Sequence, residues 1–504
     1  MENNKKLNIL IVTAFPVHGA GSGALVTTQA TSYIKNGHNV TIITANNRTD
    51  YPKVDGVKYY TVPFTGENEN PEKIEGQLPF NYLMFTTHTE STATFWNIGL
   101  DQLKDYEEAF RTAIKTEVDE FNPDVIHAQH NWISSAVCTE FGKPVVLTIH
   151  GTDLMGFERS QTEMKKLIEQ HKNPNLSEEE KQAIRDEIAK YTYFAEKAKE
   201  SAANCQKVIV ISEDQKNKFC SLFPEASDKV ELVKNGYNPE QFHVDKNINL
   251  DEVYDKLSSN RSEDGKLPKD FDKMVLFVGK FADFKGIDVL LDAAKIYEEE
   301  LANKNINVQT VVVGTGSLEK DLWEQADRLN LKNTHFVGLQ RPDVTCPLQN
   351  IATVSLVPSR KEPFGLVVIE GTACAHPVIG TNSGGIPDIL NTTGKAIKEH
   401  YDFEKDCNDD SILKPDEGTA GTYTTPLGML VPMDDSKALA DAVVKIVSGE
   451  KQFDNKQIAE YTEATYSQDV ITEHLISLFN EAIEIKNQAK KKSPSFDDDD
   501  NGLR

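Results

Sequence analysis

Two glutamates in the segment 355–389 have a spacing that suits ligand binding or catalysis. Glu362 is followed directly by Pro-Phe-Gly-Leu, and Glu370 comes eight positions after it. A proline suits a helix start, because its missing N–H would have no partner there. We therefore expect Glu362 in a loop before a helix that begins near Pro363, and Glu370 more than one turn inside that helix.

The start of this helix would also form an anion site. The backbone N–H groups of Phe364, Gly365 and Leu366 would point outward at the helix N-terminus. Two carboxylates with an anion site between them suit a ligand whose hydroxyl groups flank phosphates, as in a nucleotide-sugar. Alternatively, Glu362 caps the helix and Glu370 is a solvated carboxylate, since acidic residues are common near helix starts.

Two lysines follow the strand expected at 274–278. Lys280 lies at the strand end, and Lys285 lies just before a helix expected from Ile287 to Glu299. Their ammonium groups could converge on a diphosphate. The alternative is that both lysines are simply solvated.

The first half places polar side chains where two predicted strands end. His127 and His130 belong to the strand at 123–130, and His150 and Asp153 follow the strand that begins at 143. Ligands of open α/β sheets bind beyond the carboxyl ends of the strands. A histidine followed by glycine at such an end favours a functional role for His150.

The first predicted turn is rich in glycine. A strand at 7–13 is followed by Gly19, Gly21 and Gly23, a helix, and a strand at 40–44. A dinucleotide fingerprint requires G-x-G-x-x-G and an acidic residue after the second strand. This sequence has G-x-G-x-G and ends the strand in Thr-Ala-Asn, so a dehydrogenase is disfavoured. The glycines allow close approach of a ligand to the backbone, or simply form a tight turn.

Strands and helices alternate along the whole chain, which predicts an α/β protein with parallel sheets. We expect a Rossmann-like domain at 1–245, with a helical excursion at 157–204, and a second one at 246–465. A helix at 466–488 should follow, and the low-complexity tail 489–504 should be disordered.

Composition excludes some classes of function. The 504 residues contain 54 Lys plus Arg against 79 Asp plus Glu, a net charge of −25, which argues against broad binding to nucleic acid. No apolar run is long enough to span a bilayer, and no signal peptide is expected. Six cysteines without C-x-x-C spacing indicate reduced thiols, no metal site and a cytoplasmic location. The acidic pair Asp270 and Asp272 precedes a strand, where it is poorly placed to hold a metal.

Several motifs carry a resemblance to a known family. They are KNGYNPEQF at 234–242, GKFADFKG at 279–286, VVVGTGSLEKDL at 311–322, HFVG at 335–338, EPFGLVVIE at 362–370, GTNSGGIPDI at 380–389 and HGTD at 150–153. On these motifs the sequence resembles the retaining glycosyltransferases of family 4, also called glycosyl transferases group 1. The resemblance implies the GT-B architecture, in which two Rossmann-like domains face each other across a central cleft and the C-terminal helix crosses back to the N-terminal domain.

The resemblance also implies a role for each candidate residue. Glu362 would bind hydroxyls of the transferred sugar, and Glu370 would bind the ribose of the nucleotide. His150 would face the donor sugar near the reacting carbon. Diphosphate and donor contacts would come from Lys280, Lys285, Phe364, Gly365, Leu366, Gly21 and Ser22, and acceptor contacts from His130 and Asp153. The family usually has arginine at the position of Lys280, and lysine loses the bidentate fork.

The reaction implied is transfer of a hexosyl group from a nucleotide-diphosphate sugar, UDP-linked by preference, to an acceptor hydroxyl with retention. The leaving phosphate itself would take the acceptor proton, so no cofactor or metal is required. The acceptor stays unidentified, and a homo-oligomer stays open. The alternatives are a GT-B-type epimerase or phosphorylase, or a non-catalytic nucleotide-sugar-binding protein.

Overall fold

The structure is a computed structural model that describes residues 6–17, 21–48, 50–66, 76–86, 91–257, 267–397, 409–416 and 421–492. The chain divides into two compact units. The first comprises Met1–Val210, Lys216–Val233 and Thr472–Arg504, and the second comprises Ile211–Gln215 and Lys234–Ile471. Each unit is built around its own seven-stranded sheet.

The sheet of the first unit has the order β3-β2-β1-β4-β5-β6-β7, and all of its paired strands are parallel. Its inner strands are buried because both faces of a parallel sheet are covered by helices, whereas the edge strands β3 and β7 are only partly buried. The strands are β1 Asn8–Thr13, β2 Asn39–Asn46, β3 Lys58–Pro63, β4 Val125–Gln129, β5 Val145–Thr148, β6 Lys207–Val210 and β7 Val230–Leu232.

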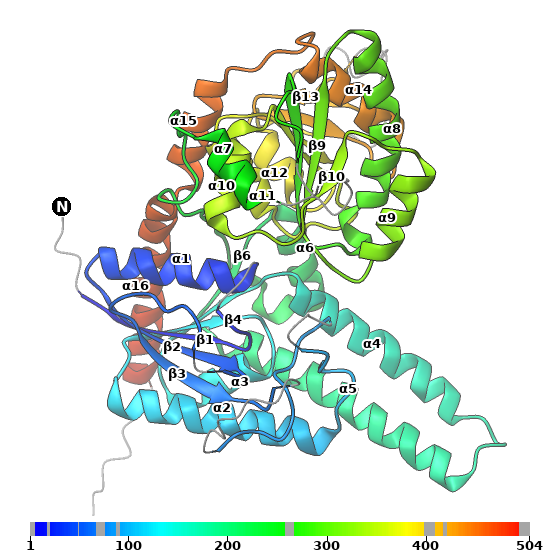
Figure 1. The fold of residues 1–504 in the computed structure, drawn as a ribbon. Helices are drawn as coiled ribbons and strands as arrows, with labels where there is room; N and C mark the ends of the chain where they lie inside the picture. Colours follow the sequence, from blue (N-terminus) through cyan, green and yellow to red (C-terminus); the bar gives the residue numbers. More distant parts are fainter. Residues whose placement is uncertain are drawn as a thin grey trace, which may run out of the picture. The chain divides into compact units, whose positions relative to one another are not determined.

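Helices cover both faces of this sheet. The connection through α1 and the later one through α2 run across the sheet in opposite directions, and right-handed crossovers therefore place these helices on opposite faces. Figure 1 shows α1 on one side of the sheet and α2 on the other. The helices are α1 Ser22–Lys35, α2 Leu100–Glu120, α3 Ile133–Cys138, α4 Thr152–His171, α5 Glu178–Asn204, α6 Glu213–Leu222 and α16 Gln468–Lys492, with short 3-10 helices η1 Thr139–Phe141 and η2 Pro224–Lys229.

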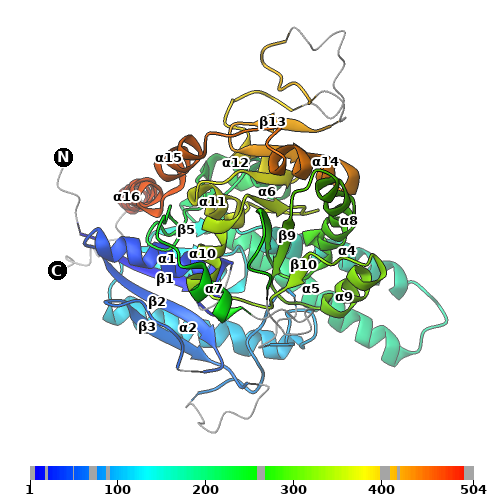
Figure 2. The ribbon, with the colours of Figure 1, turned by 45° about the horizontal axis from the view of Figure 1, so that its top comes forward.

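The helical excursion predicted at 157–204 is the pair α4 and α5. The two helices run side by side and extend away from the sheet (Figures 1 and 2). The predicted capping box is present, since Ser177 accepts a hydrogen bond from the Glu180 amide and Glu180 accepts one from the Ser177 amide. The base of α5 is buried, where Phe194 stacks on Trp132 with ring centroids 5.0 Å apart.

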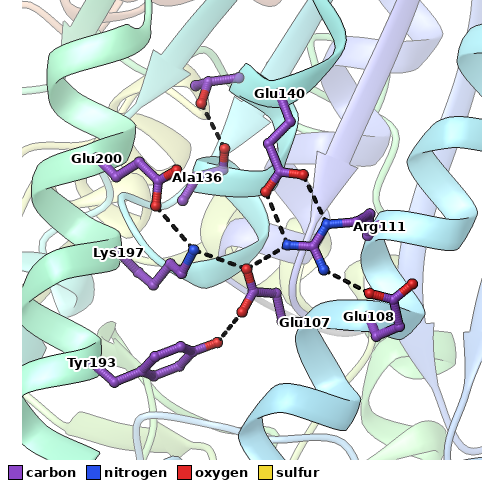
Figure 3. A network of polar contacts seen from close by, with 9 residues as sticks. Glu107, Glu108, Arg111, Ala136, Glu140, Tyr193, Lys197 and Glu200 are labelled. Atoms are coloured by element: carbon purple, nitrogen blue, oxygen red, sulfur yellow. Dashed lines mark hydrogen bonds and ion pairs between the residues drawn. The ribbon is translucent and has the colours of Figure 1, made fainter.

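A network of ion pairs also holds α5 against α2 and η1 (Figure 3). Glu107 of α2 accepts hydrogen bonds from Tyr193 at 2.5 Å and Arg111 at 2.6 Å, and pairs with Lys197 at 2.9 Å. Arg111 in turn binds Glu140 of η1 at 2.8 Å. Burial acts to raise the pKa of Glu107, but these hydrogen bonds outweigh it and lower the pKa below the usual value. Glu107 is therefore the ionised centre of the network.

The second unit repeats the strand order of the first over five strands and exchanges the last two. Its order is β10-β9-β8-β11-β12-β14-β13, parallel except for the antiparallel pair β13 and β14. Helices α8, α9 and α14 gather on one side of this sheet in Figure 2. The strands are β8 Lys273–Val278, β9 Val308–Val313, β10 Thr334–Phe336, β11 Val354–Val357, β12 Val378–Thr381, β13 Tyr423–Thr425 and β14 Gly428–Val431. The helices are α7 Leu250–Lys256, η3 Asp283–Lys285, α8 Ile287–Asn303, α9 Glu319–Arg328, α10 Pro342–Ile351, α11 Leu366–Ala373, α12 Ile386–Leu390, α14 Ser436–Val447 and α15 Asn455–Tyr466.

The boundaries between the units differ from the predicted ones. The chain enters the second unit at Lys234 rather than at 246, because the Tyr237 amide donates to the Tyr466 carbonyl at 3.0 Å and Phe242 is buried in the second unit's core. The last helix, predicted at 466–488, spans Gln468–Lys492 and joins the first unit from Thr472. The first residues of the predicted tail are thus helical, and the remainder lies outside the described residues.

Candidate functional site

The predicted site residues fall into two groups, one in each unit. In the second unit, β11 lies between β8 and β12, so the loops that follow these three strands meet at one edge of the sheet. These loops carry the lysines, Glu362 and the Gly384–Gly385 turn. This neighbourhood follows from the strand order and could not be predicted from the sequence alone.

Lys285 and Glu362 are in direct contact. The Lys285 Nζ lies 2.6 Å from Glu362 Oε2, and the two side chains are 22% and 11% exposed. Lys285 ends the η3 turn, whereas Glu362 lies in the loop between β11 and α11. The predicted loop position of Glu362 is confirmed. The contact places a cation and an anion together in a mostly buried setting.

The Glu362 loop is held by the turn before α12. The Gly385 amide donates to the Glu362 carbonyl at 2.8 Å. Gly384 has φ +55, and a Cβ there would lie 2.0 Å from the same carbonyl oxygen. A side chain is therefore excluded at this position by both conformation and space.

Helix α11 begins at Leu366, with Gly365 as its N-cap at φ 109. Within the described part of the chain, the amides of Phe364, Gly365 and Leu366 donate no hydrogen bond to another residue. Three unpaired donors at a helix N-terminus form a site that can accept an anion. The predicted helix start near Pro363 is confirmed to within a few residues.

Glu370 lies inside α11, as predicted, and is half-buried. Burial, with the Cys346 thiol adding to it, raises the pKa of the Glu370 carboxyl to about 7. The helix packs closely on the sheet below, since a Cβ on Gly371 would lie 3.3 Å from the Val378 side chain of β12 and 2.9 Å from His376 Nε2. The His376 ring contacts the Ser355 hydroxyl at 2.8 Å. The position of Glu370 is thus fixed by its helix.

Lys280 lies at the end of β8, as predicted, separated from the strand by Gly279. Burial lowers the pKa of its ammonium group. The acidic pair Asp270 and Asp272 lies at the opposite end of β8: Asp272 accepts a hydrogen bond from the Asn307 amide at 2.8 Å, and the Asp270 carbonyl accepts one from the Asn307 side chain at 2.7 Å. Over the described ranges, no group of three or more His, Cys, Asp or Glu residues could hold a metal ion.

In the first unit, His150 and His130 lie together beyond β5 and β4. Their ring centroids are 4.3 Å apart. His150 Nε2 lies 2.7 Å from Gln129 Oε1, and burial lowers the pKa of His150 to about 4. His130 has φ 69, and burial lowers its pKa well below the usual value. Both rings are therefore neutral near pH 7, able to hydrogen-bond but not to carry a charge.

Asp153 serves the local fold. It is 1% exposed, and it accepts hydrogen bonds from the Asn131 amide at 2.8 Å and the Leu154 amide at 3.1 Å. Burial raises the pKa of this carboxyl, and the backbone donors oppose that effect. These contacts join the β4 and β5 loops, and the acceptor role of Asp153 stays a prediction.

The other predicted positions in the first unit are partly described. Gly21 is the N-cap of α1 with φ 71, and Ser22 is the first residue of that helix, whereas Gly19 lies outside the described residues. His127 is a core residue: its ring contacts Thr148 at 2.8 Å, and burial lowers its pKa to about 3.

Two amide side chains in this region, Gln129 and Asn131, were not among the predicted site residues. Gln129 contacts His150, and Asn131 is 1% exposed with neither of its amide atoms hydrogen-bonded inside the described structure. A buried amide with unmet hydrogen bonds is costly, so Asn131 is a candidate for contact with a ligand. The sequence does contain a pattern that could have indicated both residues, since the polar run His-Ala-Gln-His-Asn ends an otherwise apolar strand.

Two family models match most of the chain. The model described as Glycosyltransferase Family 4 matches residues 19–241, and the one described as Glycosyl transferases group 1 matches residues 259–404. The chain belongs to the family 4 glycosyltransferases.

Proteins similar in sequence to this glycosyltransferase are also named as glycosyltransferases. The protein called uncharacterized glycosyltransferase MJ1607 of Methanocaldococcus jannaschii is 28% identical over 72% of this chain and 76% of its own length. The capsular polysaccharide biosynthesis glycosyltransferase CapM of Staphylococcus aureus is 30% identical over 41% of this chain and 53% of its own.

Solved structures share the fold. Sucrose-phosphate synthase of Thermosynechococcus elongatus has a TM-score of 0.59 at 18% identity, covering 95% of this chain and 100% of that one. HepE of Anabaena, in complex with UDP and glucose, has a TM-score of 0.57 at 14% identity, covering 94% and 100%. The glycosyltransferase therefore has the GT-B fold class expected from its sequence, with two Rossmann-like units. Its described helices include none long and apolar enough to cross a membrane.

Proposed function

We propose that this glycosyltransferase transfers a hexosyl group from a UDP-sugar to an acceptor hydroxyl with retention of configuration. The observation that carries the proposal is the pairing of Lys285 with Glu362 at 2.6 Å beside the unpaired amides that open α11. A diphosphate needs cations and N–H donors, and a sugar needs carboxylate acceptors. The HepE structure, which holds UDP and glucose in the same fold, supports the choice of UDP.

In the proposed complex the donor separates the Lys285–Glu362 pair. The ammonium group of Lys285 moves to the diphosphate, and the Glu362 carboxylate accepts hydrogen bonds from sugar hydroxyls. Lys280 and the amides of Phe364 to Leu366 add further positive potential at the diphosphate. Glu370, when ionised, accepts hydrogen bonds from the ribose hydroxyls. Each group exchanges an existing partner, or solvent, for one on the donor.

The proposed chemistry breaks the bond between the anomeric carbon and the diphosphate oxygen and forms one to the acceptor oxygen. The acceptor proton passes to a departing phosphate oxygen on the same face of the sugar. Charge builds up on the diphosphate as it leaves, so fixed cations and N–H donors lower the barrier. We propose that these groups suffice without a metal ion.

The first unit would supply neutral hydrogen-bonding groups. His150 cannot act as a cationic acid near pH 7, since its pKa lies at about 4, so we assign it a hydrogen bond to a hydroxyl of the donor sugar. His130 and the unpaired amide of Asn131 are the groups we assign to the acceptor. A polyhydroxylated acceptor matches this mixture of donors and acceptors.

A nucleotide screen followed by product analysis tests the proposal. UDP, ADP and GDP are compared by thermal shift, and we expect UDP to raise the unfolding temperature most. The Lys285→Ala variant should show a much smaller shift, whereas Lys304→Ala, which changes an exposed lysine at the end of α8, should keep the full shift. The same shift in wild type and Lys285→Ala would contradict the site.

The reaction itself is read by mass spectrometry after incubating UDP-hexoses with sugar acceptors, with and without EDTA. Transfer that survives EDTA, with the donor's anomeric configuration kept in the product by NMR, is the expected result. Formation of an epimeric UDP-sugar without acceptor would favour an epimerase. Tight UDP binding with neither transfer nor hydrolysis would favour a binding protein.

A further inference from the structure

Arg360 occupies the loop between β11 and α11, two residues before Glu362, and its side chain is 23% exposed. Its guanidinium group binds Asp288 through two nitrogens, at 3.0 and 2.6 Å. The same group donates to the Asp283 carbonyl at 2.6 Å and to the Asp434 carboxylate at 2.6 Å. Arg360 thus uses its Nε and both terminal nitrogens.

These partners come from three separate segments. Asp283 lies in η3, two residues before Lys285, and Asp288 lies in the first turn of α8. Asp434 follows β14, in a left-handed turn at φ 57. A guanidinium offers five donors in a rigid plane, whereas a lysine ammonium could reach only part of this set. The contacts therefore require arginine.

The backbones of the two loops also touch on either side of Lys285. The Arg360 amide donates to the Phe284 carbonyl at 2.8 Å. Gly286 has φ +64, and a Cβ there would lie 2.0 Å from the Pro358 carbonyl oxygen. The turn that carries Lys285 is thereby held against the loop that carries Glu362.

We propose that Arg360 is a positioning residue, which fixes the Lys285 turn relative to Glu362 so that diphosphate and sugar are bound in one geometry. The inference rests on the proposed function, because it assumes that Lys285 binds the diphosphate. Ligand contacts lose strength when their supporting residues shift by a fraction of an ångström. Arg360 touches both supporting loops and lies outside the set of residues assigned to the donor.

The same contacts predict a small effect of Arg360 on overall stability. Asp283 is 90% exposed and Asp434 is 58% exposed, so their ion pairs with Arg360 are largely screened by water. The bidentate pair with Asp288, which is 44% exposed, is only moderately shielded. Loss of the arginine should therefore alter loop geometry more than it alters the unfolding temperature.

Calorimetry with UDP and uridine tests the inference. Arg360→Gln should weaken UDP binding about tenfold, since it removes several charge-assisted hydrogen bonds that place Lys285, and should leave uridine binding within about twofold. Arg360→Lys should show a partial loss, because it keeps one donor. Arg328→Gln, an exposed arginine at the end of α9, is the matched control and should bind both ligands as wild type does.

A double-mutant cycle separates positioning from a general structural role. In a Lys285→Ala background, Arg360→Gln should weaken UDP binding by less than about twofold, because residues that act through one another are non-additive. Asp288→Asn, which keeps Arg360 but weakens its bidentate partner, should reproduce the loss in the same direction. It also covers the case in which Arg360→Gln fails to fold.

Two outcomes would overturn the inference alone. One is wild-type UDP affinity in both Arg360→Gln and Asp288→Asn while Lys285→Ala weakens UDP binding. The other is an equal loss from Arg360→Gln with and without Lys285. Failure of the wild-type protein to bind UDP, ADP or GDP would instead overturn the proposed function, and the inference with it.

Discussion

Glu370 should make nucleotide binding depend on pH close to neutrality. Its pKa is raised to about 7 by burial, with Cys346 adding to the effect. A ribose hydroxyl donates its hydrogen to an ionised carboxylate more strongly than to a protonated one. Binding should therefore be strong above pH 7 and weaken as Glu370 becomes protonated below it.

The size of the effect follows from the pKa. If only the ionised form binds ribose, the apparent affinity falls about tenfold for each pH unit below 7 and is nearly constant above pH 8. The stability of the fold depends on pH in the opposite direction. A carboxyl with a raised pKa in the folded state stabilises that state at low pH, and this contribution is lost as pH rises through 7. Glu370→Gln should thus weaken UDP binding yet raise the unfolding temperature of the free protein at pH 8.

Calorimetric titrations with UDP at several pH values between 5.5 and 8.5 measure how the affinity changes below and above pH 7. The diphosphate itself titrates near pH 6, so the profile of Glu370→Gln supplies the correction for the ligand. The variant should keep only the ligand's slope. Glu463→Gln, in the separate helix α15, is a matched control and should retain the wild-type profile.

Two results would refute this reasoning. The first is a wild-type affinity that does not change between pH 6 and pH 8 after correction for the ligand. The second is a Glu370→Gln variant that binds UDP as tightly as wild type at pH 8. A variant that loses both binding and thermal stability at pH 8 would show instead that the carboxylate supports the fold.

Three further predictions concern Glu362, Gly384 and Glu107. Glu362→Gln should lower turnover at least about a hundredfold while UDP affinity changes little, because its carboxylate would face the sugar in the proposed complex; equal losses of both would contradict the assignment. Gly384→Ala should abolish UDP-dependent thermal shift, since its Cβ would lie 2.0 Å from the Glu362 carbonyl; unchanged binding would show that the loop can move. Glu107→Gln should lower the free energy of unfolding, measured in urea, by about 1–3 kcal/mol, because it leaves Lys197 without its buried partner. The control is Glu108→Gln, which changes an exposed residue of the same network and should alter the free energy of unfolding by less than about 0.5 kcal/mol.

The local structure of the segment that carries Glu362 and Glu370 could be predicted from the sequence. Pro363 and the small residues after Glu370 define a helix start and a closely packed helix, and both follow from short-range stereochemistry. The alternation of apolar strands and helices likewise predicts two α/β units. The second unit was predicted to begin at 246 but begins at Lys234. The sequence could not show this, because the contact of Tyr237 with Tyr466 joins residues far apart in the chain.

Polar networks depend on tertiary structure and were missed. Nothing local distinguishes Arg360 from a solvated arginine, since its partners Asp288 and Asp434 lie far from it in the sequence. Gln129 becomes a candidate site residue only through its contact with His150. Similarly, the local sequence could not show that Asp153 is fully buried and accepts hydrogen bonds from backbone amides.

The sequence by itself determined the family, the two βα series and the residue types that a nucleotide-sugar requires. These features are encoded in spacing along the chain, where the periodicity of helices and strands is fixed by backbone geometry. Only the tertiary structure decided that Lys285 contacts Glu362, that Arg360 joins their loops, and that burial brings the pKa of Glu370 to about 7. Distances and burial arise from the order of strands in the sheet, and that order brings together residues which the sequence keeps apart.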